Sequence, residues 1–187
     1  IDIEPARDVI RRVFLDRIVD GKGLAGVVRA AGREPLPTPL AVFELVRAIG
    51  ASVPGWEDFA LIDMGGATTD FYSHTEAFHG GDSILLRGLR EPTLKRTVEG
   101  DLGLRVSAEA LVRSEAAFLE SRLGSDGADL AALRSYAGDV CRRTDYLPAD
   151  EEGRRFDGLL AAACVRAASL RHAGVLQRVF TPQGGFQ

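Results

Sequence analysis

The chain has 187 residues, a formal net charge of −4 and 45% hydrophobic residues, which is enough for one or two domains with a sizeable core. An acidic chain without a long basic stretch argues against nucleic acid or an anionic membrane as partner. It shows no apolar run of membrane-spanning length, no signal peptide and no cysteine pattern typical of disulfides or zinc. We therefore expect a cytoplasmic protein.

Two amphipathic helices are predicted near the start of the chain. Residues 5–19 place apolar side chains at intervals of three and four, and Gly21 follows them as a stop. Thr38 and Pro39 predict the start of a second helix, with Thr38 as N-cap and Pro39 at the first helical position. We expect that helix to end at Gly50.

The most informative stretch is residues 59–73, with the sequence FALIDMGGATTDFYS. Its uncharged first four residues predict a buried strand, which ends in Asp63. A glycine pair and two threonines then lead through Asp70 into a second strand. The pattern predicts a β-hairpin with an acidic residue at the end of one strand and another at the start of the next.

This hairpin has the chemistry of a phosphate and metal site. Gly65 and Gly66 let backbone N–H groups approach an anion closely, as in a backbone nest, and Thr68 and Thr69 can add hydroxyl donors. Carboxylates repel bare phosphate, so they indicate Mg²⁺ or its water shell between them and the phosphate. The alternative is an ordinary Gly-Gly turn that binds nothing. Asp63 favours the site, because a carboxylate at the end of a buried strand is costly unless it is paired or coordinated.

Further along, residues 74–81 predict a solvated turn, and residues 83–87 predict a third strand. The three strands would form an antiparallel meander within residues 59–87. Residues 93–106 read as a loop with two glycines. Helices are then expected from Ser107 to residue 119, over residues 129–141 and, with the longest apolar stripe, over residues 150–171, before the start of a hairpin in residues 175–187.

The motif IDMGGATTD resembles the second phosphate-binding motif of the ATPase superfamily that contains actin, Hsp70 and sugar kinases. More narrowly, the chain resembles the glutamate mutase accessory family, also called MutL, which is unrelated to the DNA-repair protein of that name. The order of several short motifs carries this resemblance. They are the hairpin motif itself and residues 33–39, 86–89, 95–103, 147–151 and 171–174.

The resemblance implies an α/β fold: an incomplete half of an actin-like, ribonuclease H-like ATPase, with the antiparallel meander inside a mixed sheet and helices packed on it. Residues 1–52 would be a helical segment leading into the domain formed by residues 53–187. The loop after the third strand would return to the nucleotide, which makes Gly100 and Asp101 candidates for binding. A loop whose glycines only turn the chain, with Lys95 and Arg96 facing water, is the alternative.

The resemblance also implies ATP and Mg²⁺ as cofactors and assigns roles to the hairpin. Asp63 would position the metal or the attacking water, and Asp70 would contact metal-bound water. Backbone N–H groups and hydroxyls would hold phosphate oxygens. The donors are Gly65, Gly66 and Ala67 through the backbone, and Thr68 and Thr69 through their hydroxyls.

The implied function is an ATP-dependent accessory or reactivating protein for an adenosylcobalamin-dependent mutase such as glutamate mutase, with a homodimer possible. The alternatives are a hydantoinase or sugar-kinase relative and a non-hydrolysing pseudo-ATPase scaffold. The first phosphate loop and the adenosine loop of the superfamily are not found here. Because the sequence also begins with Ile1, we expect it to be part of a longer protein and do not expect hydrolysis by this chain alone.

Overall fold

The structure is a computed structural model that describes residues 9–10, 12–13, 17, 25–33, 35–75, 91–123, 128–175, 180–181 and 185–186. The chain forms two compact units, Ile1–Val42 and Phe43–Gln187. The boundary falls inside helix α3 (Thr38–Ser52), whereas the sequence assigned that helix wholly to the first part of the chain. All residues of the predicted hairpin belong to the second unit.

The first unit contains helix α2 (Ala25–Ala31) and the first turn of α3. Gly32 ends α2 with a φ of 65° and donates its N–H to the Val28 carbonyl at 3.0 Å, a left-handed C-cap that glycine adopts without strain. Of the predicted helix over residues 5–19, residues 9–10 and 12–13 are helical, and most of the others lie outside the described residues.

The second unit is organised around a three-stranded antiparallel sheet in the order β1 (Phe59–Met64), β2 (Thr69–His74), β3 (Leu94–Glu99). The predicted α/β class and a three-stranded antiparallel sheet are therefore confirmed. The pairing aligns Asp63 with Asp70, and Asp70 with Val98. The strands described here are all antiparallel to their neighbours, so the parallel part of the predicted mixed sheet is not among them.

The third strand of the meander differs from the prediction. Residues 83–87 lie outside the described residues, and β3, which the sequence analysis read as a loop, pairs with β2. Its charges are accommodated because they have partners. The Lys95 ammonium donates to the His172 carbonyl at 2.7 Å, and Arg96 donates to the Asp70 carboxylate. The alternative in which Lys95 and Arg96 only face water is therefore wrong.

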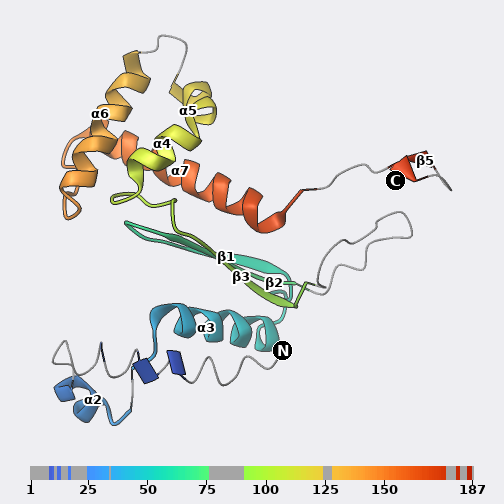
Figure 1. The fold of residues 1–187 in the computed structure, drawn as a ribbon. Coiled ribbons are helices and arrows are strands. Elements are labelled where there is room, and N and C mark those ends of the chain that lie inside the picture. Colours follow the sequence, from blue (N-terminus) through green and yellow to red (C-terminus); the bar gives the residue numbers. More distant parts are fainter. Residues whose placement is uncertain are drawn as a thin grey trace. The chain divides into compact units, whose positions relative to one another are not determined.

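Alternation along the strands gives the sheet two different faces. One face carries Phe71 and Thr97 and is covered by helix α7 (Glu151–Ala173), while the other carries Asp63, Asp70 and Arg96. Figure 1 shows α7 across one side of the sheet and the part of α3 from Phe43 on the other side. The sheet therefore lies between helices.

Helices α4 (Ala108–Ser114), α5 (Ala116–Leu123), α6 (Ala128–Arg142) and α7 form a layer beyond the sheet, visible in Figure 1. The helix expected over residues 107–119 is interrupted at Glu115, which caps α4, so it forms two helices. The helices expected over 129–141 and 150–171 are confirmed. The buried core of this layer includes Leu111, Leu119, Leu133, Val140, Phe156, Leu160 and Cys164.

Helix α7 has the clearest start and end. Asp150 caps it by accepting the Gly153 N–H at 2.6 Å, and Gly174 ends it with a φ of 78°. Cys164 on α7 is fully buried like a small core residue, and burial raises the pKa of its thiol to about 11. This thiol is a packing group.

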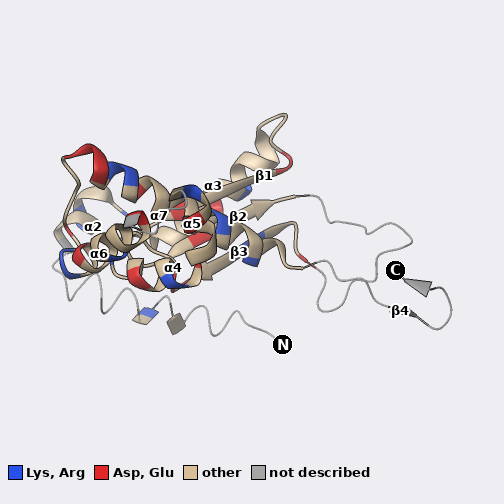
Figure 2. Cartoon of the chain, turned by 90° about the horizontal axis from the view of Figure 1, so that it is seen from above, with Lys and Arg blue, Asp and Glu red and all other residues tan. Residues whose placement is uncertain are grey.

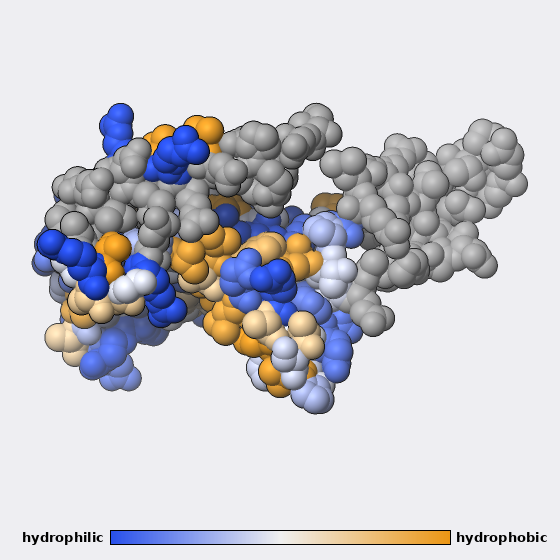
Figure 3. All heavy atoms as spheres, turned by 90° about the horizontal axis from the view of Figure 1, so that it is seen from below, coloured by the Kyte–Doolittle hydropathy of each residue, from blue (hydrophilic) through white to orange (hydrophobic). Residues whose placement is uncertain are grey.

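Charges of both signs are mixed on the helical layer, as Figure 2 shows for α4 to α7. Some join neighbouring helices, such as the ion pair between Arg166 of α7 and Glu115 at 2.5 Å. The view in Figure 3 shows hydrophobic residues intermingled with hydrophilic ones. Exposed apolar residues are normal on a protein surface.

β4 (Phe180–Thr181) and β5 (Gly185–Phe186) pair antiparallel, so residues 175–187 contain both strands of a hairpin, where the sequence predicted only its start. Within the residues described, no helix has both the length and the apolar character needed to cross a membrane.

Candidate phosphate-binding hairpin

The loop Gly65–Thr68 joins β1 to β2 and is closed by a hydrogen bond from the Gly65 N–H to the Thr68 carbonyl at 2.8 Å. In the described part of the chain, the glycines with positive φ are Gly32, Gly55 and Gly174. The loop therefore lacks the left-handed residue of a typical backbone nest, which corrects that detail of the prediction. Its N–H groups are oriented in another way.

The carbonyl groups of the loop are held by the segment that precedes and begins α4, residues 102–107, which we call the backing segment. Three consecutive loop carbonyls accept hydrogen bonds from it. The donors are Leu104 N–H to Gly65 at 3.1 Å, Arg105 N–H to Gly66 at 2.8 Å and Ser107 Oγ to Ala67 at 2.7 Å. Ser107 stands at the N-cap position of α4, but its hydroxyl serves this contact and makes no cap bond.

These three bonds fix the direction of the next N–H groups. In a planar trans peptide the carbonyl and the following N–H point in opposite directions. The N–H groups of Gly66, Ala67 and Thr68 therefore point away from the backing segment, and among the described residues none of them has a hydrogen-bond partner. The loop presents three neighbouring donors on its free side, as an anion site requires.

Close approach explains which glycine is essential. A Cβ on Gly103 would lie 2.5 Å from the Ala67 carbonyl carbon, a distance that no side chain can occupy. A Cβ on Gly66 would lie 3.4 Å from the Arg105 Cβ, and one on Gly65 would lie 3.3 Å from the Thr68 carbonyl oxygen, so both are tight but not blocked. The strictest steric requirement therefore lies in the backing segment, and Gly103 was missing from the predicted site.

The two predicted carboxylates are cross-strand neighbours on one face of the sheet. Asp70 is only 7% exposed, and its Oδ1 accepts bonds from Nε and Nη2 of Arg96 at 2.9 and 2.6 Å. Asp63 is half-buried and has no ion pair or hydrogen bond to another described side chain. Burial and the charge of Asp70 raise the pKa of Tyr72, which lies on the same face.

The two threonines differ. Thr69 is fully buried, and its Oγ1 donates to the Leu102 carbonyl at 2.8 Å, on the face opposite the carboxylates. Thr68 is half-buried, and its hydroxyl has no partner within the described ranges. Thr69 thus joins the hairpin to the backing segment, while Thr68 stands beside the free N–H groups.

Asp101 contacts helix α7. Arg171 donates from Nη1 and Nη2 to the two carboxylate oxygens of Asp101 at 2.6 and 2.9 Å, and its Nη1 also donates to Glu99 at 2.7 Å. The Arg171 hydrogen bonds lower the pKa of Asp101. Gly100 is exposed, and a Cβ there would touch nothing within 4 Å. The structure therefore ties Asp101 to the end of α7.

Arg105 anchors the backing segment in the helical layer. It is 8% exposed, and its Nη1 and Nη2 donate to Oδ1 and Oδ2 of Asp157 on α7 at 2.9 and 2.8 Å. Its Nε donates to the Tyr146 carbonyl at 3.1 Å, and the Tyr136 hydroxyl donates to Asp157 Oδ1 at 2.8 Å. The bond to Asp157 raises the pKa of Arg105, so this is a charged, fully paired contact.

The described residues contain no group of three or more His, Cys, Asp or Glu side chains that could hold a metal by themselves. Mg²⁺ does not require one, because it commonly binds one or two carboxylates and takes its other ligands from water and phosphate. Asp63 and Asp70 fit that pattern, with Asp63 free to bind. His74 pairs with Phe59 at the other end of the hairpin from Asp63 and Asp70, and its Nδ1 hydrogen-bonds the Glu57 carbonyl at 2.7 Å.

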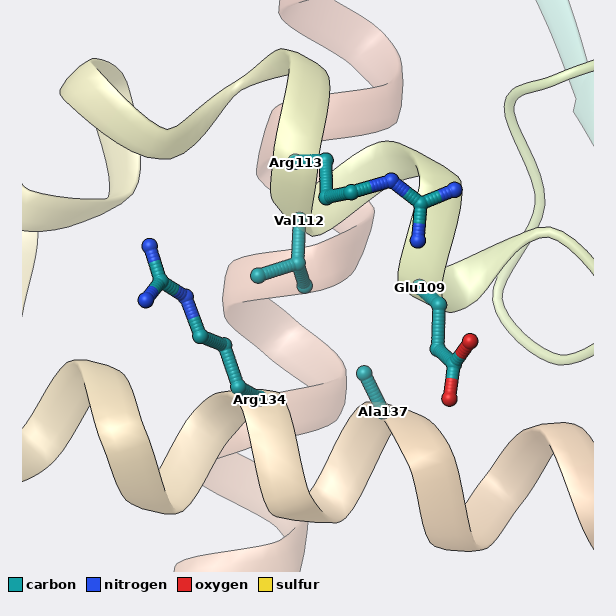
Figure 4. Close-up of a pocket in the computed structure, with 5 residues that line it drawn as sticks. All are labelled: Glu109, Val112, Arg113, Arg134 and Ala137. Carbon is teal, nitrogen blue, oxygen red and sulfur yellow. The ribbon is translucent and has the colours of Figure 1, made fainter.

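A separate concavity lies between α4 and α6 (Figure 4). Val112 and Ala137 lie between the helices, and the charged side chains of Glu109, Arg113 and Arg134 surround them. In Figure 4 the two arginines extend in different directions, so they do not converge on one ligand.

Comparison with known proteins adds the family. The family model described as MutL protein matches residues 1–187. The chain belongs to the MutL family. It is also 35% identical over 188 residues to Protein MutL of Clostridium tetanomorphum, a match that covers 98% of this chain and 40% of that relative. The chain therefore spans less than half the length of this relative. No solved structure matches.

Within this MutL-family chain, the sequence predicted the hairpin but not the residues behind it. Arg105 and Gly103 lie more than 30 residues beyond the loop that they contact. A glycine before a helix and a single arginine are common, and neither identifies a partner so far away in sequence. The available clue was that the family resemblance covered residues 95–103, with Gly100 and Gly103, together with the hairpin motif.

Proposed function

We propose that this chain is part of an ATP-dependent accessory protein that reactivates an adenosylcobalamin-dependent mutase such as glutamate mutase. Membership of the MutL family and the resemblance of the hairpin motif to that of actin-like ATPases support the proposal. The single observation that carries the nucleotide site is the row of three outward N–H groups beside a free carboxylate, Asp63.

The roles of the site residues follow from their positions. The N–H groups of Gly66, Ala67 and Thr68 would hold phosphate oxygens, with the Thr68 hydroxyl beside them. Asp63 would bind Mg²⁺, which neutralises charge on the β- and γ-phosphates in phosphoryl transfer. The chain itself positions these groups and supplies the donors.

Asp70 and Thr69 would support the site without contacting the phosphates directly. The carboxylate of Asp70 is engaged by Arg96 but keeps its Oδ2 for a water of the metal shell. Thr69 would contribute by fixing the loop on the backing segment, since its hydroxyl donates to Leu102. Asp101 would be released to the nucleotide only by breaking its pair with Arg171.

The chain spans 40% of its relative, so the complete nucleotide site and the mutase contact would need the longer protein. In that protein, a γ-phosphate at the hairpin would favour one arrangement of two domains and its loss another, which is the two-state device of nucleotide switches. Such a movement would release damaged cobalamin from the mutase.

The test uses the full-length protein that contains this chain. Asp63→Ala should weaken MgATP binding by more than about tenfold, which corresponds to about 1.4 kcal/mol, because the free carboxylate contacts the metal. Asp129→Ala is the matched control, since it removes an exposed aspartate of α6 that lies 3.4 Å from Arg155. Titration calorimetry gives the affinities, and thermal unfolding checks that both variants fold. Equal affinities for Asp63→Ala and the parent protein would contradict the site.

The partner is tested separately. The parent protein with MgATP should restore a mutase inactivated by damaged cobalamin, and Asp63→Ala should not. Restoration of the mutase without nucleotide would contradict ATP dependence, and no restoration under any condition would contradict the assigned partner.

A non-hydrolysing scaffold is the second candidate, and the Asp70–Arg96 ion pair favours it. Arg96 neutralises the Asp70 carboxylate and occupies its Oδ1, so only Oδ2 is left for metal-bound water. If the full-length protein binds neither MgATP nor MgADP, the scaffold function replaces the ATPase proposal.

A further inference from the structure

The backing segment is the part of the molecule that orients the hairpin loop. It contributes every hydrogen bond that the carbonyls of Gly65, Gly66 and Ala67 make to described residues, and it accepts the hydroxyl of buried Thr69. Gly103 permits this contact, because its missing Cβ would overlap the Ala67 backbone. If the segment moved away, nothing in these contacts would keep the N–H groups turned outward.

The backing segment is in turn held by Arg105. The guanidinium makes a two-bonded ion pair with Asp157 of α7 and also donates to the carbonyls of Tyr146 and Leu104. The thiol of Cys141 on α6 donates to the Arg105 carbonyl at 3.0 Å. The ion pair therefore links the loop backbone to α7, and its two side chains are only 10% and 21% exposed.

We propose that Arg105 and Asp157 are a positioning pair for the phosphate-binding loop: they hold the backing segment so that the N–H groups of Gly66, Ala67 and Thr68 face the ligand. Neither side chain touches the ligand. This inference deepens the proposed function and rests on it for the identity of the ligand, whereas the orientation of the loop can be measured without any ligand.

The pair also couples the site to the helical layer. Because binding and conformation are linked reciprocally, an anion that favours the outward N–H groups must favour the intact Arg105–Asp157 pair by the same factor. MgATP should therefore slow hydrogen exchange in α7 near Asp157. Loss of the ion pair should in turn lower the affinity for MgATP. The coupling runs through direct contacts: the Gly66 carbonyl accepts from the Arg105 N–H, and the Arg105 guanidinium donates to the Asp157 carboxylate.

The experiment compares Asp157→Asn and Tyr136→Phe with Glu115→Gln in the full-length protein. The first removes the charge that Arg105 requires, and the second removes only the hydroxyl that donates to Asp157. Glu115→Gln is the control, because it breaks the ion pair between Arg166 and Glu115, another contact of α7 away from the loop. Hydrogen exchange of the Leu104 and Arg105 amides reports the loop bonds, and MgATP affinity reports the site.

We expect Asp157→Asn to raise the exchange rate of these two amides by at least about tenfold, and to lower the affinity for MgATP by at least about tenfold. Tyr136→Phe should cause smaller changes in the same direction. Glu115→Gln should change neither the amide exchange nor the MgATP affinity, although its melting temperature should be similar to that of the other variants. If Asp157→Asn does not fold, Tyr136→Phe decides. Unchanged exchange of the Leu104 and Arg105 amides, or equal losses in the control, would overturn the positioning role.

The two proposals fail in different ways. If the parent protein binds no MgATP but Asp157→Asn still speeds exchange at Leu104 and Arg105, the nucleotide proposal is wrong and the positioning of the loop stands. If MgATP binds and neither variant alters affinity or exchange, the site stands and the positioning role is wrong.

Discussion

The two faces of the three-stranded sheet use the same strands for different tasks. On the α7 side, Phe71 stacks on His172 at 4.4 Å between ring centres, and the two ring nitrogens of His172 bond to the hydroxyls of Ser73 and Thr97. On the other side, Asp63 and Asp70 lie together near the loop. The first face is closed and fully paired, and the second keeps charge near its loop end.

The difference shows which face of the sheet can carry charged groups with little loss of folding stability. Packing against α7 supplies stability to the hairpin from one side, so the opposite side can hold two neighbouring carboxylates whose charges repel. Substitutions on the two faces should therefore separate stability from binding.

Phe71→Ala should have the largest effect. Phe71 is buried against α7, and removal of a buried phenylalanine costs about 3–5 kcal/mol in the free energy of unfolding. Urea unfolding followed by circular dichroism measures this loss. Val98→Ala on the other face is the matched control, because Val98 is 49% exposed and its truncation should cost far less. Similar losses in the two variants would contradict the assignment of the faces.

Arg96→Gln should have an intermediate effect. It leaves the buried Asp70 carboxylate without its ion-pair partner, and the loss of hydrogen bonds to a charged group costs about 1.5–3 kcal/mol in the free energy of unfolding. The double variant Arg96→Gln with Asp70→Asn should recover part of the loss, since no unpaired charge remains. A double-mutant cycle on unfolding free energies measures the coupling. Additive losses would show that Arg96 does not stabilise Asp70.

His172 should give a small, pH-dependent effect. Burial and then the charge of Lys95 lower the pKa of His172 in the folded protein, although Glu91 and Glu99 oppose this. The unfolded chain therefore binds the proton more readily, so this stability is fully present above about pH 6.5 and falls as the pH drops below it. The slope is at most about 1.4 kcal/mol per pH unit for one proton.

The measurement for His172 is urea unfolding at several pH values between the unfolded pKa and lower pH. His172→Gln should remove this part of the pH dependence, while Glu115→Gln, which alters another α7 contact, should keep it. The same slope in His172→Gln and the parent protein would assign the dependence to other groups.

The sequence predicted the elements that depend only on residues close together in the chain. The apolar stripe of α7, the Asp150 cap and the strand–Gly-Gly–strand pattern of the hairpin each lie within one short stretch. These elements occur in the structure with boundaries close to the predicted ones. The hairpin and its acidic residues were found for the same reason.

The elements that depend on distant partners were not predicted. β3 reads as a charged loop because Lys95 and Arg96 find their partners in His172 and Asp70, which lie at other positions in the chain. Gly103 reads as a turn residue until the loop that it contacts is in place. The break at Glu115, which divides the predicted helix into α4 and α5, has no clear indication in the sequence.

One consequence of the backing segment concerns the thermodynamics of binding. Because the three loop carbonyls are already held before any ligand arrives, the donors are preorganised, and the loop loses little conformational entropy when an anion binds. Association should then show a small heat-capacity change, without the large negative value of coupled folding. Diffusion and the attraction between phosphate, metal and donors would set the rate of capture.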